Sequence, residues 1–311
     1  MTSAMPLRAP AGRVAIHIDG VLLLDKPVGP SSTRVLGHVK RLLGASKAGH
    51  GGTLDPMASG LLPVMFGEAT KYAAEGLDAD KTYLADVMLG EKTSTGDAEG
   101  EVIGTSTIPA ELIAQTIATV LEKFRGPQTQ IPPMYSALKK DGKALYAYAR
   151  AGEQIVREPR NITIHQISLE SVSLPVFTIR VTCSKGTYIR TLAEDIGAAL
   201  GQAAHLKSLR RIGVGSLFSD QVVPLDAIEH ASPSERLEFL KPVDWLIRDL
   251  SAVQLSASNA QRFTHGQSVM LSGDTAVGRV RVQNAHGQFI GTGTVNERKL
   301  LNPERVRVLS S

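Results

Sequence analysis

The residues best suited to chemistry lie in one glycine-rich segment, Gly49 to Gly60. Four glycines among these twelve residues allow the main chain to approach a ligand closely. Pro56 biases the preceding residue away from helix, so the carboxylate of Asp55 is presented on an extended or turn backbone. Such a carboxylate can serve as a nucleophile or a base. An Asp-Pro pair is also a common turn, and local chemistry alone favours the turn.

Signatures of other chemistry are missing from the sequence. No glycine-rich loop ends in Gly-Lys-Ser or Gly-Lys-Thr, and no two of the eight histidines have zinc-helix spacing. Gly291-Thr292-Gly293 is more typical of a β-turn than of a dinucleotide fingerprint. The single cysteine, Cys183, cannot form an intramolecular disulfide and lies in an alternating apolar run, where a buried thiol is expected. We therefore expect no metal, no cofactor and a reducing cytoplasmic location.

Length and composition indicate a globular protein of about two domains. The 311 residues are 42% hydrophobic and 21% charged, and 34 Lys and Arg against 30 Asp and Glu permit a polyanionic partner without requiring one. No apolar run approaches the roughly 20 residues that cross a bilayer, so we expect no membrane association. Residues 1–18 are expected to form a loose extension, because prolines and polar residues interrupt any signal-peptide core.

The elements before Asp55 must position it. Gly20–Leu24 is typical of a short buried strand, and Ser31-Ser32 can cap a helix that carries Val35, Val39, Leu42 and Leu43 at helical spacing. Gly44 is a plausible end of that helix. The segment Ala48–Gly60 is expected to be a loop that leads into the apolar run Leu61–Phe66.

Further along, strands and helices alternate at irregular spacing. Alternating side chains predict strands at residues 83–89 and, most strongly, 177–183. Helical stripes predict helices at 112–124, 145–150 and 192–200, the last ended by Gly201. Without regular βα repetition, this order favours an α+β fold with a mixed, largely antiparallel sheet. Short β-like runs from residue 269 to 309 predict a small β-rich domain, so we divide the chain at 1–18, 19–250 and 251–311.

Several motifs, in matching order and spacing, resemble the bacterial tRNA pseudouridine synthases that modify the T-loop uridine. They cover about residues 20–215 and comprise Leu24-Asp25-Lys26-Pro27 with Gly29 and Ser31-Ser32, Gly49-His50 and Leu54 to Pro63, Asp80-Lys81-Thr82-Tyr83, Gln130 to Lys139, Ser184 to Thr191, His205-Leu206, and Leu209-Arg210-Arg211. The resemblance implies the catalytic fold of that family. It also implies that the C-terminal region is a β-barrel-like RNA-binding domain of the PUA type.

The resemblance assigns the catalytic roles. Asp55 matches the catalytic aspartate, and Arg190 matches the arginine that pairs with it, where a guanidinium can hold both carboxylate oxygens in one plane. Tyr83 matches the tyrosine that stacks on the target uracil. Lys26 with Pro27 resembles a motif that supports the catalytic loop. From the residues alone, a surface cation at the start of a helix is the better interpretation of Arg190, and strand packing is an equally good interpretation of Tyr83.

Three further positions match residues that contact substrate. His50 corresponds to the histidine that enters the T loop, and Tyr188 and Leu209 to residues that line the pocket and exclude water. A turn histidine and ordinary core residues are the alternative interpretations. One departure is visible: Gly51 stands where many members of the family carry threonine, which affects a local loop contact.

The implied reaction isomerises uridine 55: the N1–C1′ bond breaks, the base turns, and C5 joins C1′. Asp55 would act by attacking the nucleotide or by removing the C2′ proton. The implied partner is the T stem-loop of tRNA, bound by a monomer. An RNA-folding factor with a secondary or vestigial isomerase site, and a nucleoside hydrolase, are the alternatives. Basic residues scattered along the chain could converge on one RNA-facing side: Arg34, Lys40, Arg41, Lys47, Lys139, Lys140, Lys143, Arg150, Arg157, Arg160, Lys207, Arg210 and Arg211.

Overall fold

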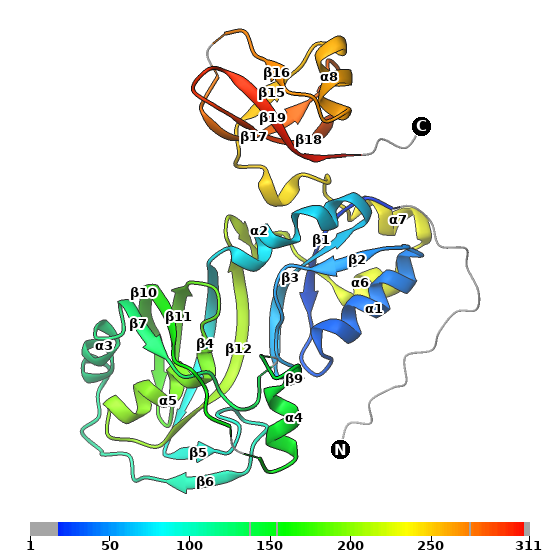
Figure 1. Ribbon diagram of the computed structural model, residues 1–311. Coiled ribbons are helices and arrows are strands. Elements are labelled where there is room, and N and C mark those ends of the chain that lie inside the picture. The colour runs from blue at the N-terminus through cyan, green and yellow to red at the C-terminus, as the bar shows by residue number, and fades with distance from the viewer. Residues whose placement is uncertain (1–17, 137, 154, 274, 308–311) are drawn as a thin grey trace.

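A large mixed sheet organises the first two thirds of the chain, and a small curled sheet forms the rest (Figure 1). The computed structural model describes residues 18–136, 138–153, 155–273 and 275–307. The predicted loose extension therefore lies almost wholly outside the described residues. Within the described ranges, no helix combines the length and apolar character needed to cross a membrane.

The large sheet has ten strands and is mostly antiparallel, which confirms the predicted fold class. Only two of its pairings, β1 with β14 and β3 with β12, are parallel among the described residues. In spatial order the strands are β14 (Val223–Pro224), β1 (Gly20–Lys26), β3 (Ala58–Phe66), β12 (Ala204–Val214), β4 (Lys81–Leu89), β11 (Val176–Cys183), β10 (Arg160–Ser173) and β7 (Gly126–Gln130), with β2 (Ala48–His50) beside β3 and β13 (Leu217–Phe218) beside β12.

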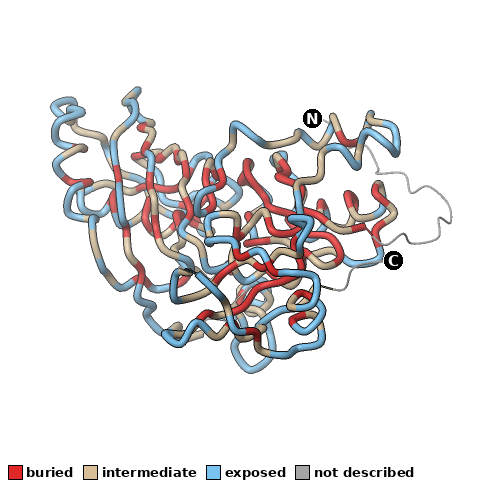
Figure 2. Tube along the Cα trace, turned by 90° about the horizontal axis from the view of Figure 1, so that it is seen from above, coloured by how far each residue is buried: buried red, intermediate tan, exposed pale blue. Residues whose placement is uncertain are grey.

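Helices and short hairpins surround this sheet. The helices are α1 (Ser32–Leu43), α2 (Ala73–Asp78), α3 (Ala114–Glu122), α4 (Leu145–Arg150), α5 (Ile189–Ala199), α6 (Leu225–His230) and α7 (Pro233–Glu238), with 3₁₀ turns η1 (Gly67–Tyr72), η2 (Ser219–Gln221) and η3 (Trp245–Ile247). Two hairpins pair β5 (Glu91–Thr93) with β6 (Val102–Thr105) and β8 (Lys139–Lys140) with β9 (Lys143–Ala144). Figure 2 shows buried chain along the central strands and exposed chain around them.

The apolar run that begins β1 is buried on both faces of the sheet. Leu22 and Leu24 belong to the main core with α1, whereas Val21 and Leu23 belong to a second core on the opposite face. Strand β3 divides in the same way, with Leu61 and Met65 in the second core. A strand covered on both faces has no polar alternation, and this explains the continuous apolar sequence.

The predicted ends of α1 are confirmed. The Ser31 side chain accepts a hydrogen bond from the Arg34 amide, and Gly44 adopts a left-handed φ of 69° at the C-terminal cap. The alternating segments predicted as strands are β4 and β11, and the helical stripes correspond to α3, α4 and α5. Helix α3 begins at Ala114, later than its apolar stripe suggests.

The segment Ala48–Gly60 is not a loop throughout. Its ends are strands, because β2 covers Ala48–His50 and β3 begins at Ala58. Two long strands, β10 and β12, carry no clear alternation in sequence. Each has two irregularities in its pairing, and a β-bulge shifts the phase of the side chains and so hides the period of two.

The C-terminal region forms a curled five-stranded sheet, a half-barrel that agrees with the predicted β-barrel-like domain (Figure 1). Its strands are β15 (Ala252–Gln254), β17 (Gly278–Gln283), β18 (Phe289–Val295), β19 (Leu300–Val306) and β16 (Val269–Met270). Helix α8 (Ala257–Thr264) contributes Ala260 and Phe263 to a core that the domain builds from its own residues.

Gly60 offers a test of how closely β3 and β12 must approach. Its φ is +102°, and an added Cβ would lie 2.2 Å from the Arg211 carbonyl oxygen. We expect Gly60→Ala to lower the free energy of unfolding by more than about 2 kcal/mol, because backbone strain and a clash with backbone add together. Urea denaturation measures this.

Gly37→Ala is the matched control, because Gly37 lies inside α1 and its nearest neighbour would be 3.7 Å from the new Cβ. That variant should gain up to about 1 kcal/mol from helix propensity. Equal effects of the two substitutions would contradict the close approach at Gly60.

Candidate active site

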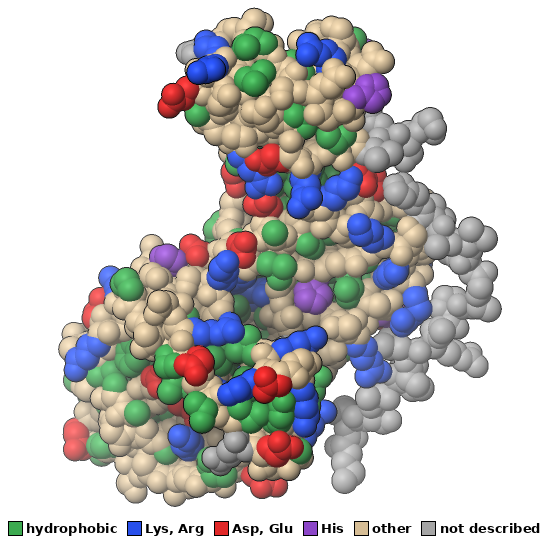
Figure 3. Space-filling model, in the orientation of Figure 1, with side chains coloured by type: hydrophobic (Ala, Val, Ile, Leu, Met, Phe, Trp, Pro, Cys, Tyr) green, Lys and Arg blue, Asp and Glu red, His purple; other side chains and the backbone are tan. Residues whose placement is uncertain are grey.

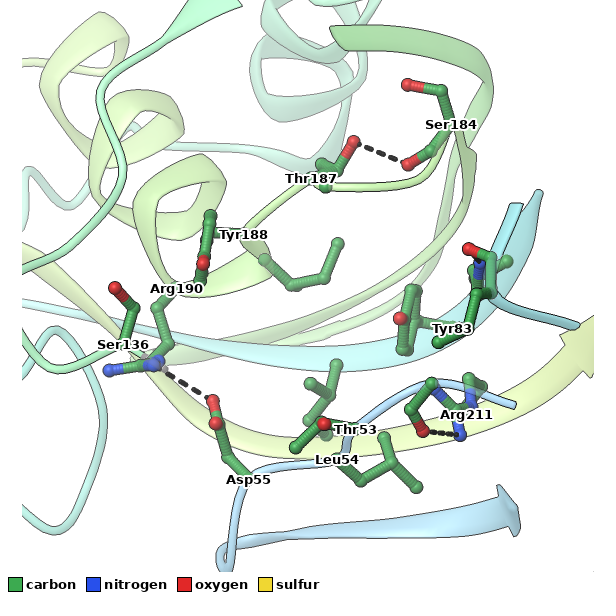
Figure 4. A pocket seen from close by; sticks show the side chains of 16 residues that line it. Thr53, Leu54, Asp55, Tyr83, Ser136, Ser184, Thr187, Tyr188, Arg190 and Arg211 are labelled. Atoms are coloured by element: carbon green, nitrogen blue, oxygen red, sulfur yellow. Dashed lines mark hydrogen bonds and ion pairs between the residues drawn. The ribbon is translucent and has the colours of Figure 1, made fainter. Parts of the chain in front are cut away.

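A pocket of about 220 Å³ opens where β4, β12 and the start of α5 face the segment between β2 and β3 (Figure 4). Five residues singled out by sequence line it: Asp55, Tyr83, Tyr188, Arg190 and Leu209. They are distant in sequence, so the sheet brings them together. His50 is not among the lining residues.

The buried side chains of Lys26 and Ser32 hold the backbone of the segment that carries Asp55. The fully buried Lys26 ammonium donates to the carbonyl oxygens of Ala58 at 2.7 Å and Pro56 at 3.4 Å. The Ser32 hydroxyl donates to the Leu54 carbonyl at 2.9 Å and accepts from its amide at 2.8 Å. The Asp55 side chain stays 40% exposed. A rigid backbone therefore presents an accessible carboxylate, in agreement with the supporting role that the Lys26 motif implies.

Arg190 holds the Asp55 carboxylate from the second position of α5. Its Nη2 lies 3.0 Å from Asp55 Oδ2, and its side chain is only 5% exposed. Nη2 also donates to the Tyr135 carbonyl at 2.7 Å, and Nη1 donates to the Thr95 carbonyl at 3.1 Å. The expected grip on both oxygens of Asp55 is wrong in detail, because Nε points to a second carboxylate, Asp97, at 3.5 Å.

Asp97 is a buried residue of the site that the sequence did not indicate. It lies between β5 and β6, where it forms an isolated bridge with Leu206 of β12. Its Oδ1 accepts hydrogen bonds from the Thr95 hydroxyl at 2.6 Å and the Glu99 amide at 3.1 Å. Asp97 thereby supplies a second negative charge to Arg190. A buried cation that contacts two carboxylates is fixed in orientation.

Tyr83 lines the same cavity from β4, away from the Asp55–Arg190 pair in Figure 4. Its side chain is buried, and burial raises the pKa of its phenol to about 12. The phenol is therefore neutral at ordinary pH, which leaves an intact aromatic face and a hydroxyl at the cavity.

Tyr188 and Leu209 close the cavity from two other elements. The Tyr188 amide donates to Gln130 Oε1 at 2.8 Å, and Gln130 Nε2 donates back to the Tyr188 carbonyl at 3.0 Å. This double contact fixes the backbone just before α5. Burial raises the pKa of Tyr188. Leu209, on β12, is 9% exposed and adds apolar surface.

His50 ends β2 and is half-buried outside the pocket. Its Nδ1 atom is buried and has no hydrogen-bond partner among the described residues. Burial lowers the pKa of its imidazole, and the nearby Arg211 lowers it further. The structure therefore does not bring this predicted substrate contact to the cavity wall.

Two buried cations, Arg211 and Lys81, line the pocket in addition to the predicted site residues. The prediction that Arg211 lies on an RNA-facing surface is wrong: its side chain is 1% exposed and donates to the carbonyls of Leu61 at 2.7 Å and Gly52 at 3.0 Å. Lys81 donates to the carbonyls of Leu77, at 2.7 Å, and Ala79. Residues two apart in a strand lie on the same face of the sheet. Lys81 lies two residues before Tyr83 and Arg211 two residues after Leu209, so this spacing could have predicted that both line the pocket.

Burial has a strong effect on the pKa of Lys81 in the pocket wall and of Lys26 beneath the Asp55 segment. It lowers the pKa of Lys26 to about 8, although the nearby Asp55 carboxylate opposes the change. It lowers the pKa of Lys81 to about 8 as well, and Arg211 adds to the effect. Within the described residues, no group of three or more His, Cys, Asp or Glu side chains is arranged to hold a metal ion.

Models of known families match nearly the whole chain. Residues 40–189 match the N-terminal domain of the TruB family of pseudouridylate synthases. Residues 190–248 match the tRNA pseudouridylate synthase B C-terminal domain, and residues 251–306 match the pseudouridine synthase II TruB C-terminal region.

Relatives and solved structures agree with this assignment. The chain is 52% identical to proteins named tRNA pseudouridine synthase B from Burkholderia mallei, over 99% of both chains, and from Ralstonia nicotianae, over 87% of both. A Cbf5–Nop10–Gar1 complex contains a chain with 26% identity and a TM-score of 0.68. An H/ACA RNP bound to a substrate RNA containing 2′-deoxyuridine contains one with 25% identity and a TM-score of 0.69. In both cases the match covers 92% of this chain and 84% of the other. This chain therefore belongs to the TruB family of pseudouridylate synthases.

Proposed function

We propose that this chain isomerises uridine 55 in the T loop of tRNA to pseudouridine, with Asp55 as the catalytic residue. The observation that carries the proposal is the accessible Asp55 carboxylate, held at 3.0 Å by a buried Arg190 at the wall of a cavity that also contains Tyr83. Family membership and the relatives' name support tRNA as the substrate. The sequence motifs that resemble synthases of the T-loop uridine support position 55 of tRNA as the target.

The reaction gives each side chain a separate task. Asp55 starts it, either by attacking the nucleotide or by removing the C2′ proton, and the N1–C1′ bond breaks. Tyr83 stacks on the detached uracil while it turns. C5 then joins C1′ as the bond from Asp55 to the nucleotide breaks, or as the C2′ proton returns; the C5 proton leaves to solvent and N1 takes up a proton. Tyr188 and Leu209 exclude water, which would otherwise capture the sugar and convert isomerisation into hydrolysis. Stacking on an aromatic ring is worth about 1–3 kcal/mol, comparable to the cost of flipping a base.

Arg190 fixes the position of the Asp55 carboxylate. Because Asp97 and two backbone carbonyls hold the guanidinium, Asp55 meets a cation that is already oriented before substrate enters. Preorganised charge of this kind needs no rearrangement during the reaction. His50 enters the T loop, in this proposal, outside the cavity and beside the flipped base.

The rest of the molecule suits a long polyanion. Figure 3 shows Lys and Arg side chains spread over the face drawn, from the junction of the domains across the lobe that carries α1. We propose residues 19–250 as the catalytic domain and 251–311 as an RNA-binding domain of the PUA type. The separate core of residues 253–301 supports this division. The enzyme acts, in this proposal, as a monomer in the cytoplasm.

Asp55→Asn tests the catalytic assignment. The variant should form no detectable pseudouridine in a T-stem-loop transcript while binding it normally, since an amide neither attacks C1′ nor accepts the proton. Release of tritium from C5 of the labelled uridine measures the reaction. Asp226→Asn, an exposed carboxylate at the start of α6, should leave the rate unchanged.

Three results would contradict this assignment. Turnover by Asp55→Asn would remove the residue from the mechanism, and free uracil as a product would identify a hydrolase. If the wild-type protein helps tRNA to fold but releases no tritium, the protein is a folding factor and not an isomerase.

Asp97→Asn tests whether the second carboxylate orients Arg190. Loss of one buried charge should reduce the single-turnover rate about 10- to 100-fold, the range for a lost charged contact of about 1.5–3 kcal/mol. Substrate affinity should change little, because Asp97 does not line the pocket. Asp86→Asn is a matched control, since Asp86 accepts comparable hydrogen bonds from Thr178 and Ser208. A rate equal to that of the control would exclude the orienting role.

The pH dependence of the rate tests the support of the Asp55 segment. As pH rises through about 8, Lys26 loses the charge that holds the Pro56 and Ala58 carbonyls, so the single-turnover rate should fall. Unfolding does not cause the fall. The unfolded chain keeps the lysine proton up to its ordinary pKa of 10.5, so it binds more protons than the folded chain between about pH 8 and 10.5, and stability rises there.

Rates and urea midpoints measured from about pH 6 to about pH 9 separate the two effects. Lys81→Met should retain the decline, because Lys26 remains. A flat profile in wild type, or a decline that follows a loss of stability, would contradict the explanation.

A further inference from the structure

The C-terminal domain holds a short segment of the catalytic domain, η1 and α2, by two polar contacts. The Lys71 ammonium donates to the Val306 carbonyl of β19 at 2.8 Å. Arg279 of β17 places Nη1 2.6 Å from Glu75 Oε1 of α2. Both members of the second pair are about one-third exposed, so the contact is partly shielded from water.

An aromatic contact joins the same segment to the C-terminal domain. The Phe289 ring of β18 meets the Tyr72 ring of η1 edge-to-face, with centroids 5.7 Å apart. Phe289 is 6% exposed and packs in the second core of the catalytic domain, with Leu61 and Met65 of β3. One side chain of the C-terminal domain thus completes the core beneath the strand that follows Asp55.

The other end of the same segment forms part of the active-site wall. An added Cβ on Gly76 of α2 would lie 3.0 Å from Gly51 Cα, so α2 packs directly against the backbone four residues before Asp55. Leu77 lines the pocket, and the carbonyl oxygens of Leu77 and Ala79 accept hydrogen bonds from the Lys81 ammonium. The position of α2 therefore determines the pocket wall and the place of a buried cation.

Helix α2 cannot hold that position by itself. It has six residues, and no side chain caps its N-terminus. Helices shorter than about 12 residues are marginal in water, so their stability comes from tertiary packing. One part of α2 packs against the backbone of the pocket wall, and another contacts the C-terminal domain.

We propose that docking of the C-terminal domain positions the active-site wall through η1 and α2, which makes Glu75, Arg279 and Phe289 positioning residues for the isomerisation. The inference rests on the proposed function, and it gives the C-terminal domain a role in the chemical step in addition to RNA binding. None of the three side chains lines the pocket.

A charge exchange tests the polar contact. Glu75→Arg and Arg279→Glu should each lower the single-turnover rate at saturating enzyme about tenfold, with the tRNA dissociation constant within about twofold of wild type. Arg279 Nε also lies 2.9 Å from Glu304 Oε2, so the double variant with exchanged charges is made in a Glu304→Gln background, where the rate should return to within about threefold of that background. Arg298→Glu, an exposed arginine of the same domain, makes the same charge change and should leave the rate unchanged.

A second pair of variants tests the aromatic contact. Phe289→Leu should lower the rate, whereas Phe263→Leu, which alters a fully buried phenylalanine in the domain's own core, should lower stability with no matching loss of rate. Weaker tRNA binding at an unchanged saturated rate in the Glu75, Arg279 and Phe289 variants would overturn the proposal. Failure of the charge exchange to restore the rate would also overturn it.

Hydrogen exchange provides a readout that does not depend on the reaction. The amides of residues 73–82 should exchange faster in Glu75→Arg and Arg279→Glu and recover in the double variant. Unchanged exchange in both single variants would overturn the coupling. If wild type forms no pseudouridine in tRNA, the proposed function fails, and the exchange data still decide whether docking controls α2.

Discussion

The arrangement of the site depends on one buried cation, Arg190, placed between two carboxylates. A guanidinium that is 5% exposed is costly to bury unless its donors are occupied. Here the carbonyls of Thr95 and Tyr135 and the carboxylates of Asp55 and Asp97 occupy them. Asp97 is buried, whereas Asp55 remains accessible. The same arginine therefore contacts a buried carboxylate on one side and orients an accessible carboxylate at the pocket on the other.

The large sheet makes this placement possible. Strands β1 and β3 pair and are covered on both faces, so the backbone that follows Asp55 has little freedom. Buried lysine and serine side chains hold the intervening segment by its carbonyls and amides. The second core reaches Phe289 of the C-terminal domain, so the strand after Asp55 and the C-terminal domain share one packed interior.

Much of the fold could be predicted from local pattern. Helix α1 has a serine cap, a helical stripe and a terminal glycine, and β11 alternates strictly, so neighbouring residues determine both elements. The bulged strands β10 and β12 could not be predicted in this way, because each irregularity in pairing reverses the alternation. The Asp55 and Arg190 pair followed from motifs rather than from local chemistry.

The sequence by itself determined the family motifs, the chemical groups available and the elements whose signals are local. Only the tertiary structure decided which charges are buried. Arg211 looks like its exposed neighbour Lys207 in sequence, yet it lies inside the sheet with its donors on backbone carbonyls. Asp97 lies in a polar turn, yet it is buried against Arg190 behind the pocket wall. His50 lies beside the glycines, yet it does not line the pocket. Burial depends on strands from distant parts of the chain, and no local pattern encodes that packing.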